Sequence, residues 1–99
     1  MDAHELIIEQ DQLIDKMKKD DYKAFDKVYE KYFGQTYSFA HHILKNENLT
    51  TKTVTKVFIK VWKERHSTKV LSLDKYVFSL TCREIEKTLL HSAGELWCP

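Results

Sequence analysis

Apolar residues recur at helical spacing between Val54 and Trp62, and this stretch organises the rest of the chain. Positions 54, 57, 58, 61 and 62 are apolar, which is the pattern of one helical face. Four of the nine residues from Val54 to Trp62 are Val or Ile, so β-propensity alone would also allow a strand. Adjacent apolar pairs at 57–58 and 61–62 break the alternation of a strand. We therefore predict a helix over residues 50–65.

The face opposite this apolar stripe is basic. Lys52, Lys56, Lys60 and Lys63 follow one another at spacings that place them on one side of the helix. Ile59 lies among these lysines rather than on the apolar face, at about 100° per residue. Two interpretations stay open. Ile59 is either a harmless exposed residue, since single exposed apolar residues are common, or part of a surface that contacts a partner.

The same periodicity predicts two helices before this one. The first covers residues 4–19, and its apolar face carries Leu6, Leu13, Ile14 and Met17. The pair Asp20-Asp21 then predicts a stop followed by an N-cap. The second helix covers residues 22–45, and Gly34 near its middle is expected to kink or break it.

A final helix is predicted over residues 73–91, with Ser72 as its N-cap and Ser92-Ala93-Gly94 as its end. It is apolar around much of its circumference, so it should be well buried or should hold a partner. One apolar cluster contains Leu73, Tyr76, Val77 and Leu80, and the other contains Phe78, Cys82, Ile85 and Leu89. Cys82 is interpreted as a small core residue.

These elements predict an all-α fold, a compact bundle of about four helices. We expect one domain over residues 1–91 and a tail over residues 92–99. Two glycines and one proline leave little material for turns, which favours long helices joined by short loops. The side chains expected to be mostly buried are Phe25, Tyr29, Val57, Phe58, Val61, Trp62, Val77 and Leu80.

Composition narrows the function classes. The formal net charge is +1, so nucleic-acid binding would have to come from local patches. We expect reduced thiols at Cys82 and Cys98 and a cytoplasmic location, because no signal peptide, CxxC spacing or transmembrane run of about 18 apolar residues is present. No nucleophile–base pair, paired acidic site or phosphate loop stands out, so we expect neither an enzyme nor a cofactor. No metal site is expected either, since the adjacent His41 and His42 point about 100° apart.

Three segments together resemble a known family. The residues 24–32 (AFDKVYEKY), 57–66 (VFIKVWKERH) and 73–81 (LDKYVFSLT) come in the order and at the spacing of region 2 of bacterial sigma factors. The resemblance is to the extracytoplasmic-function (ECF) class of the sigma-70 family, and it covers about residues 13–90. It implies a helical domain that docks on the clamp helices of the β′ subunit of RNA polymerase core and captures the promoter −10 element, mainly as single-stranded DNA.

The resemblance also implies which residues make these contacts. The polymerase-binding positions are Lys52, Thr55, Lys56, Ile59 and Lys60. The −10-reading loop and the start of the last helix contribute the DNA-binding candidates Arg65, His66, Lys69, Lys75, Tyr76 and Arg83. Aromatic surfaces for bases and cations for phosphates are what single-strand binding requires. An anti-sigma regulator is a further candidate partner, and no membrane contact is expected.

The chain departs from the family pattern at its contact positions. The family usually has Asp, then Gln-Glu, where this chain has Lys52 and Thr55-Lys56. It also usually has Trp and Asn where Tyr76 and Arg83 stand. The family's second domain, a helix-turn-helix reader of the −35 element, is expected to be absent from this chain.

Three hypotheses of function follow. The first is a sigma region-2 domain that acts in transcription initiation by binding polymerase and promoter DNA. The second is a protein-interaction module on the same fold, which binds a regulator or polymerase without recognising a promoter. The third is a plain helical bundle with no nucleic-acid role.

Overall fold

Four helices make up the part of the chain that the structure describes. The computed structural model describes residues 12–66 and 72–97, with side chains up to position 91. A short helix over residues 12–18 is followed by α2 (Tyr22–Leu44), α3 (Glu47–Lys63) and α4 (Leu73–Trp97). No strand occurs among these residues. The predicted fold class, an all-α bundle of about four helices, is confirmed.

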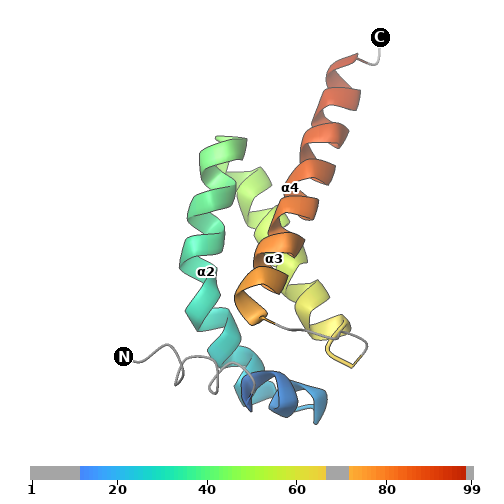
Figure 1. The fold of residues 1–99 in the computed structure, drawn as a ribbon. Helices are drawn as coiled ribbons and strands as arrows, with labels where there is room; N and C mark the ends of the chain where they lie inside the picture. Colours follow the sequence, from blue (N-terminus) through green and yellow to red (C-terminus); the bar gives the residue numbers. More distant parts are fainter. Residues whose placement is uncertain (1–11, 67–71, 98–99) are drawn as a thin grey trace.

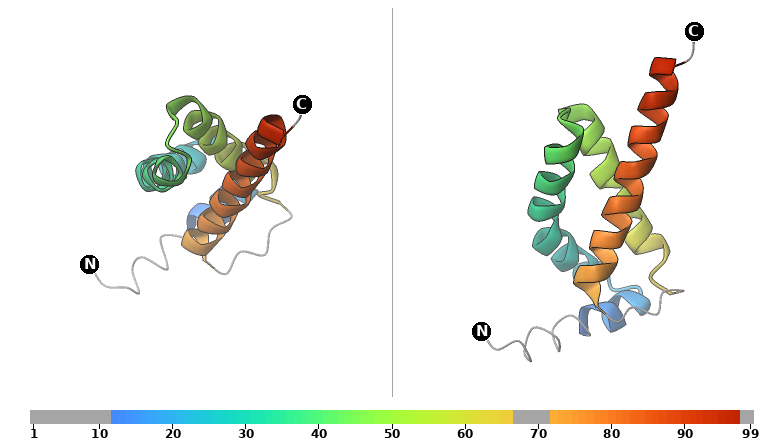
Figure 2. Two further views of the ribbon diagram at one scale, coloured as in Figure 1. Left: turned by 90° about the horizontal axis from the view of Figure 1, so that it is seen from above. Right: turned by 45° about the horizontal axis from the view of Figure 1, so that its top comes forward.

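The helices α2, α3 and α4 run up, down and up, and the short helix lies across the end where α2 and α4 begin (Figures 1 and 2). The C-terminal end of α4 extends beyond the ends of α2 and α3 (Figure 1). Leu13, Ile14 and Met17 of the short helix are buried and belong to the common core. Residues 4–11 of the predicted first helix lie outside the described residues.

Local capping chemistry sets the boundaries of α2. Asp20 has a left-handed backbone (φ 63°), which ends the preceding helical turn, and the side chain of Asp21 accepts hydrogen bonds from the backbone N–H groups of Lys23 and Ala24. The predicted stop and N-cap at this pair are therefore confirmed. At the other end, Lys45 adopts a left-handed C-cap (φ 54°).

The boundaries of α3 and α4 differ from the prediction. Asn46 caps α3 by accepting a hydrogen bond from the backbone N–H of Leu49 at 2.9 Å, so α3 begins at Glu47 rather than at residue 50. Ser72 caps α4 as predicted, since its hydroxyl oxygen accepts from the N–H of Lys75 at 3.4 Å. The predicted end of α4 at residues 92–94 is wrong, because the helix continues to Trp97. A single glycine costs a helix only about 1 kcal/mol, so Gly94 does not by itself end α4.

The core surrounds the inward face of α3. Val54, Val57, Phe58 and Val61 are buried there, between α2 and α4. From the neighbouring helices the core receives the buried side chains of Val28, Tyr32, Leu73, Val77 and Leu80. The predicted burial of Val57, Phe58, Val61, Val77 and Leu80 is thereby confirmed.

Phe25 and Trp62 are mostly buried and pack against the core, as predicted. The predicted burial of Tyr29 needs correction, because this residue is 41% exposed. These aromatic rings lie at the edge of the core, between α2 and α3. The ring of Tyr29 packs edge-on against that of buried Phe58, with 4.9 Å between the ring centroids.

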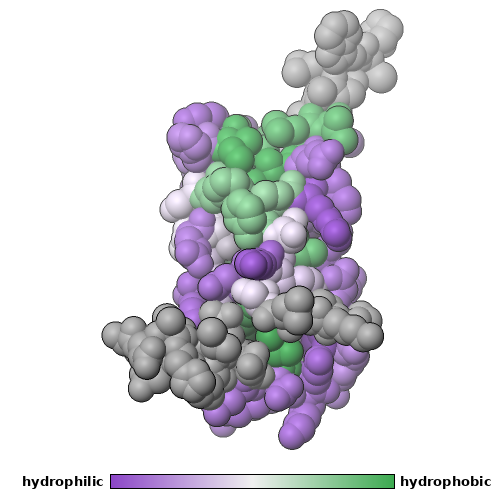
Figure 3. Space-filling model, in the orientation of Figure 1, coloured by the Kyte–Doolittle hydropathy of each residue, from purple (hydrophilic) through white to green (hydrophobic). Residues whose placement is uncertain are grey.

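The second apolar cluster predicted on α4 is mostly exposed. Ile85 is buried, but Phe78 is 56% exposed and Leu89 and Cys82 are also exposed, so the interpretation of Cys82 as a core residue is wrong. The described helices leave most of this face of α4 uncovered. Figure 3 shows the resulting apolar surface between the upper parts of α2 and α4. Among the described helices, none has the length and apolar character that crossing a bilayer requires.

Gly34 does not interrupt α2, which is one continuous helix with no positive φ at this position. A Cβ atom added at Gly34 would meet nothing within 4 Å. We expect Gly34→Ala to raise the free energy of unfolding by about 0.5–1 kcal/mol, because alanine loses less backbone entropy in a helix. Urea denaturation measures the change. Gln35→Ala, an exposed neighbour with a similar helix propensity to alanine, is the matched control and should change little. A loss of stability in Gly34→Ala would contradict a continuous α2.

Candidate functional site

The burial of α3 on two sides leaves one narrow strip of this helix in solvent. We call it the α3 ridge. It consists of the exposed residues Lys52, Thr55, Lys56, Ile59 and Lys63. At about 100° per residue, these five positions fall within about 100° of one another on the helix circumference. Four of the five candidate polymerase-binding residues therefore lie side by side. Ile59, which is 46% exposed, is the one apolar member of the ridge.

An aromatic groove of about 420 Å³ flanks the α3 ridge on the side of α2. Tyr22 packs on Trp62 with 4.7 Å between ring centroids, and Phe25 meets the same indole edge-on at 5.4 Å. The groove is lined by Tyr22, Phe25, Tyr29, Thr55, Phe58, Ile59, Trp62 and Lys63. Its apolar walls and exposed rings suit an apolar side chain of a partner.

A basic groove of about 380 Å³ flanks the α3 ridge on the other side, against α4. The hydroxyl groups of Thr53 and Thr88 are hydrogen-bonded across its floor at 2.8 Å. The groove is lined by Leu49, Lys52, Thr53, Lys56, Glu84, Lys87, Thr88 and His91. The two grooves thus place apolar surface on one side of the ridge and positive charge on the other.

Glu84, which the sequence analysis missed, ties α3 to α4 beneath the basic groove. Its side chain is 4% exposed, and its Oε1 lies 2.5 Å from Nζ of Lys60 and 3.5 Å from Nζ of Lys87. Burial raises the pKa of the Glu84 carboxyl, but the two ammonium groups outweigh burial and hold that pKa below its usual range. The hydrogen bond from Lys60 to Glu84 in turn raises the pKa of Lys60. Lys60 is therefore turned toward α4 and is not part of the α3 ridge.

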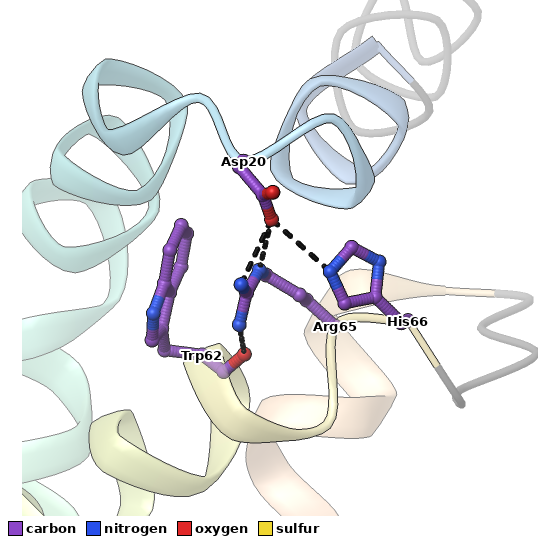
Figure 4. A network of polar contacts seen from close by, with 4 residues as sticks. All are labelled: Asp20, Trp62, Arg65 and His66. Atoms are coloured by element: carbon purple, nitrogen blue, oxygen red, sulfur yellow. Dashed lines mark hydrogen bonds and ion pairs between the residues drawn. The ribbon is translucent and has the colours of Figure 1, made fainter.

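Two DNA-binding candidates, Arg65 and His66, are held by Asp20 in the turn before α2 (Figure 4). Oδ1 of Asp20 accepts hydrogen bonds from Nε and Nη2 of Arg65 at 3.0 and 2.8 Å, and lies 3.0 Å from Nε2 of His66. Nη1 of Arg65 donates to the backbone carbonyl of Trp62 at 2.7 Å, and its guanidinium lies 3.8 Å from the centroid of the indole ring. Hydrogen bonding from Arg65 holds the pKa of Asp20 below its usual range.

The remaining DNA-binding candidates lie along the first half of α4. The hydroxyl of Tyr76 donates to Oε2 of Glu64 at 2.6 Å, so this half-buried ring is tied to the end of α3. Lys75 and Arg83 are exposed. Arg83 follows Tyr76 by two helical turns, about 10 Å further along the helix. Lys69 lies outside the described residues.

A third groove, of about 520 Å³, opens between α2 and the start of α4. The hydroxyl of Tyr32 donates to Oδ1 of Asp74 at its base, and the exposed ring of Phe78 packs on that of Phe39 with 5.3 Å between centroids. The groove is lined by Tyr32, Gln35, Thr36, Phe39, Asp74, Lys75, Val77, Phe78 and Thr81. It offers aromatic faces next to one cation, Lys75, and the sequence analysis did not assign it a role.

In the described part of the chain, no cluster of three or more His, Cys, Asp or Glu side chains could hold a metal ion. Comparison of the chain with protein-family models, with curated proteins and with solved structures finds no match. The geometry above and the resemblance of the three sequence segments are therefore the basis for inferring a function.

The pair of Lys60 and Glu84 has a testable signature. We expect Glu84→Gln to lower the free energy of unfolding at pH 7 by roughly 1–3 kcal/mol, because Lys60 loses a charged partner and the site stays mostly buried. The folded pKa of Glu84 is lowered, so the contribution of the carboxylate is present above the unfolded pKa of about 4.3 and is lost as pH falls through the folded value. The loss of unfolding free energy in Glu84→Gln, relative to the unmodified domain, should therefore be smaller below about pH 4 than at pH 7. Urea denaturation between pH 3 and pH 7 tests this, with Glu86→Gln, an exposed glutamate on the same helix, as control. A deficit independent of pH would contradict the ion pair.

Proposed function

We propose that this chain is a sigma-factor region-2-like domain that acts in transcription initiation. In this proposal the α3 ridge docks on the clamp helices of the β′ subunit of RNA polymerase core. The start of α4 and the groove between α2 and α4 hold the promoter −10 element as single-stranded DNA. The resemblance of three segments in family order motivates the proposal, and the exposure of Ile59 on the ridge is the structural observation that supports it most.

Ile59 supports protein docking because of its surroundings. It is nearly half exposed at the edge of the aromatic groove, where Tyr22 and Trp62 also present open ring surface. Binding energy in protein interfaces concentrates in such apolar and aromatic anchors, which a polar rim shields from water. Lys52 and Lys56 provide a charged rim beside this anchor. The other interpretation, in which Ile59 is an exposed residue without a role, does not account for the aromatic groove next to it.

The α2–α4 groove supports binding of a single strand. Phe39 and Phe78 present aromatic faces there, and Lys75 adds a cation that can contact a phosphate. The cations near this groove are few and the net charge is +1, so binding by the domain alone should be weak and sensitive to salt.

A protein-interaction module without promoter recognition is the second candidate function. It is favoured because Arg65 and His66 contact Asp20, and Tyr76 donates a hydrogen bond to Glu64. These three DNA-binding candidates therefore already have partners within the chain. DNA would have to displace these contacts. In this alternative an anti-sigma regulator or polymerase itself is the partner, and the α3 ridge is again the binding surface.

Substitution of the ridge isoleucine tests the docking. We expect Ile59→Ser to weaken binding to purified RNA polymerase core by about 10-fold, since an apolar anchor at an interface contributes on the order of 1–2 kcal/mol. Fluorescence anisotropy of the labelled domain measures the affinity. Leu90→Ser removes a comparably exposed apolar side chain from α4, away from the ridge, and should leave binding unchanged. Equal affinities of Ile59→Ser and the unmodified domain would contradict docking through the ridge.

Promoter recognition is tested with a labelled single strand that carries a −10 sequence. We expect Tyr76→Ala and Arg83→Ala each to weaken binding several-fold at low salt, because base stacking and a phosphate contact are each worth about 1–3 kcal/mol at most. Tyr76→Phe keeps the ring and removes the hydroxyl that donates to Glu64, so it is the matched control and should bind like the unmodified domain. If Tyr76→Ala and Arg83→Ala both bind normally, these residues do not read DNA and the second candidate function is favoured.

A further inference from the structure

We propose that the partner helix docked on the α3 ridge is acidic. Its apolar residues would occupy the aromatic groove, and its carboxylates would lie over Lys52, Lys56 and Lys87 of the basic groove. This inference rests on the proposed docking at the ridge and specifies the charge of the partner. An acidic helix fits the second candidate function, a protein-interaction module, better than docking on the clamp helices, which are basic where acidic family members contact them. It runs opposite to the family pattern, in which acidic residues occupy the positions of Lys52 and Lys56.

The charge of the basic groove is only partly balanced within the chain. Lys52 and Lys56 are exposed, and neither forms an ion pair with any residue that the structure describes. They lie one helical turn apart, about 6 Å along α3. Lys87 faces them from α4 with its side chain 63% exposed. The one carboxylate that lines this groove, Glu84, is buried against Lys60, so the surface left to a partner is positive.

Both grooves lie within reach of one helix. They flank the same ridge, and a helix with its side chains is about 10–12 Å across. A helix lying along the ridge would present apolar residues to Ile59 and Trp62 on one side and carboxylates to the lysines on the other. This is the helix-in-groove mode of recognition, in which apolar anchors supply affinity and charges set register and specificity.

A protein helix fits these grooves better than a nucleic acid. The floor of the basic groove is made by Leu49, Thr53 and Thr88, and no aromatic ring lines it on which a base could stack. The rings that could stack a base lie on the other side of the ridge, in the aromatic groove. A basic partner is disfavoured because its cations would meet Lys52 and Lys56, and like charges in contact oppose association.

Charge exchange on both partners tests the inference. The probes are the recombinant clamp-helix hairpin of a bacterial β′ subunit and the same hairpin with its exposed Arg and Lys residues replaced by Glu. We expect the domain to bind the acidic hairpin about 10-fold more tightly than the basic one in calorimetry at fixed salt, a difference of about 1.4 kcal/mol that several weak ion pairs at the rim can supply. In the triple variant Lys52→Glu, Lys56→Glu and Lys87→Glu the preference should reverse. The preference should also shrink at high salt.

The matched control is the triple variant Lys19→Glu, Lys23→Glu and Lys27→Glu. It changes the net charge equally at exposed lysines that line neither groove, so it should keep the preference for the acidic hairpin. Circular dichroism confirms that each variant is folded.

Four outcomes would overturn the inference. If the unmodified domain prefers the basic hairpin, or if both triple variants behave alike, the lysines do not select an acidic partner, while docking through Ile59 stands. If neither hairpin binds, the proposed docking fails as well. If the triple variant of Lys52, Lys56 and Lys87 instead loses affinity for a single-stranded oligonucleotide and keeps its affinity for both hairpins, these lysines contact nucleic acid.

Discussion

The burial of α3 between α2 and α4 is the constraint on which the rest of this structure depends. Val54, Val57, Phe58 and Val61 enter the core together, and each is at most 3% exposed. Because helix geometry fixes the angle between positions, burying these four leaves only the opposite strip of α3 in solvent. The α3 ridge, with Ile59 at its centre, is therefore a direct consequence of the packing of the core.

Polar ties between distant segments decide which cations remain available to a partner. Lys60 forms an ion pair with the buried carboxylate of Glu84, and Arg65 forms one with Asp20 and lies over the indole of Trp62. Lys52 and Lys56 have no such tie within the described residues. The separation between internal and available cations explains why we assign the lysines of the ridge to a protein partner. It also explains why promoter recognition through Arg65 and His66 is the weaker part of the proposed function.

Much of the fold could be predicted because local rules determine it. The spacing of apolar residues identified the buried face of α3 and left Ile59 opposite to it, and the pair Asp20-Asp21 marked a stop and a cap that the structure confirms. Periodicity says which residues share a face, but not whether a neighbour covers that face. Tyr29 and Cys82 were therefore expected inside and lie outside.

The candidate site was less predictable because it depends on long-range contacts. Glu84 falls on the same helical face as Val77 and Leu80, and an acid within an apolar stripe signals a buried partner, but the sequence does not identify that partner as Lys60. The contact of Arg65 with Asp20 joins residues separated by 45 positions, which no local pattern specifies.

Site-specific cross-linking to purified RNA polymerase core tests the central claim, that the α3 ridge is a protein-docking surface, most directly. A photo-reactive phenylalanine analogue would replace Ile59 in one sample and Phe78, an exposed apolar residue on α4, in another. The account predicts a cross-link from position 59 to the clamp helices of β′ and a much weaker one from position 78. Cross-linking from position 78 alone, or none from position 59, would contradict it.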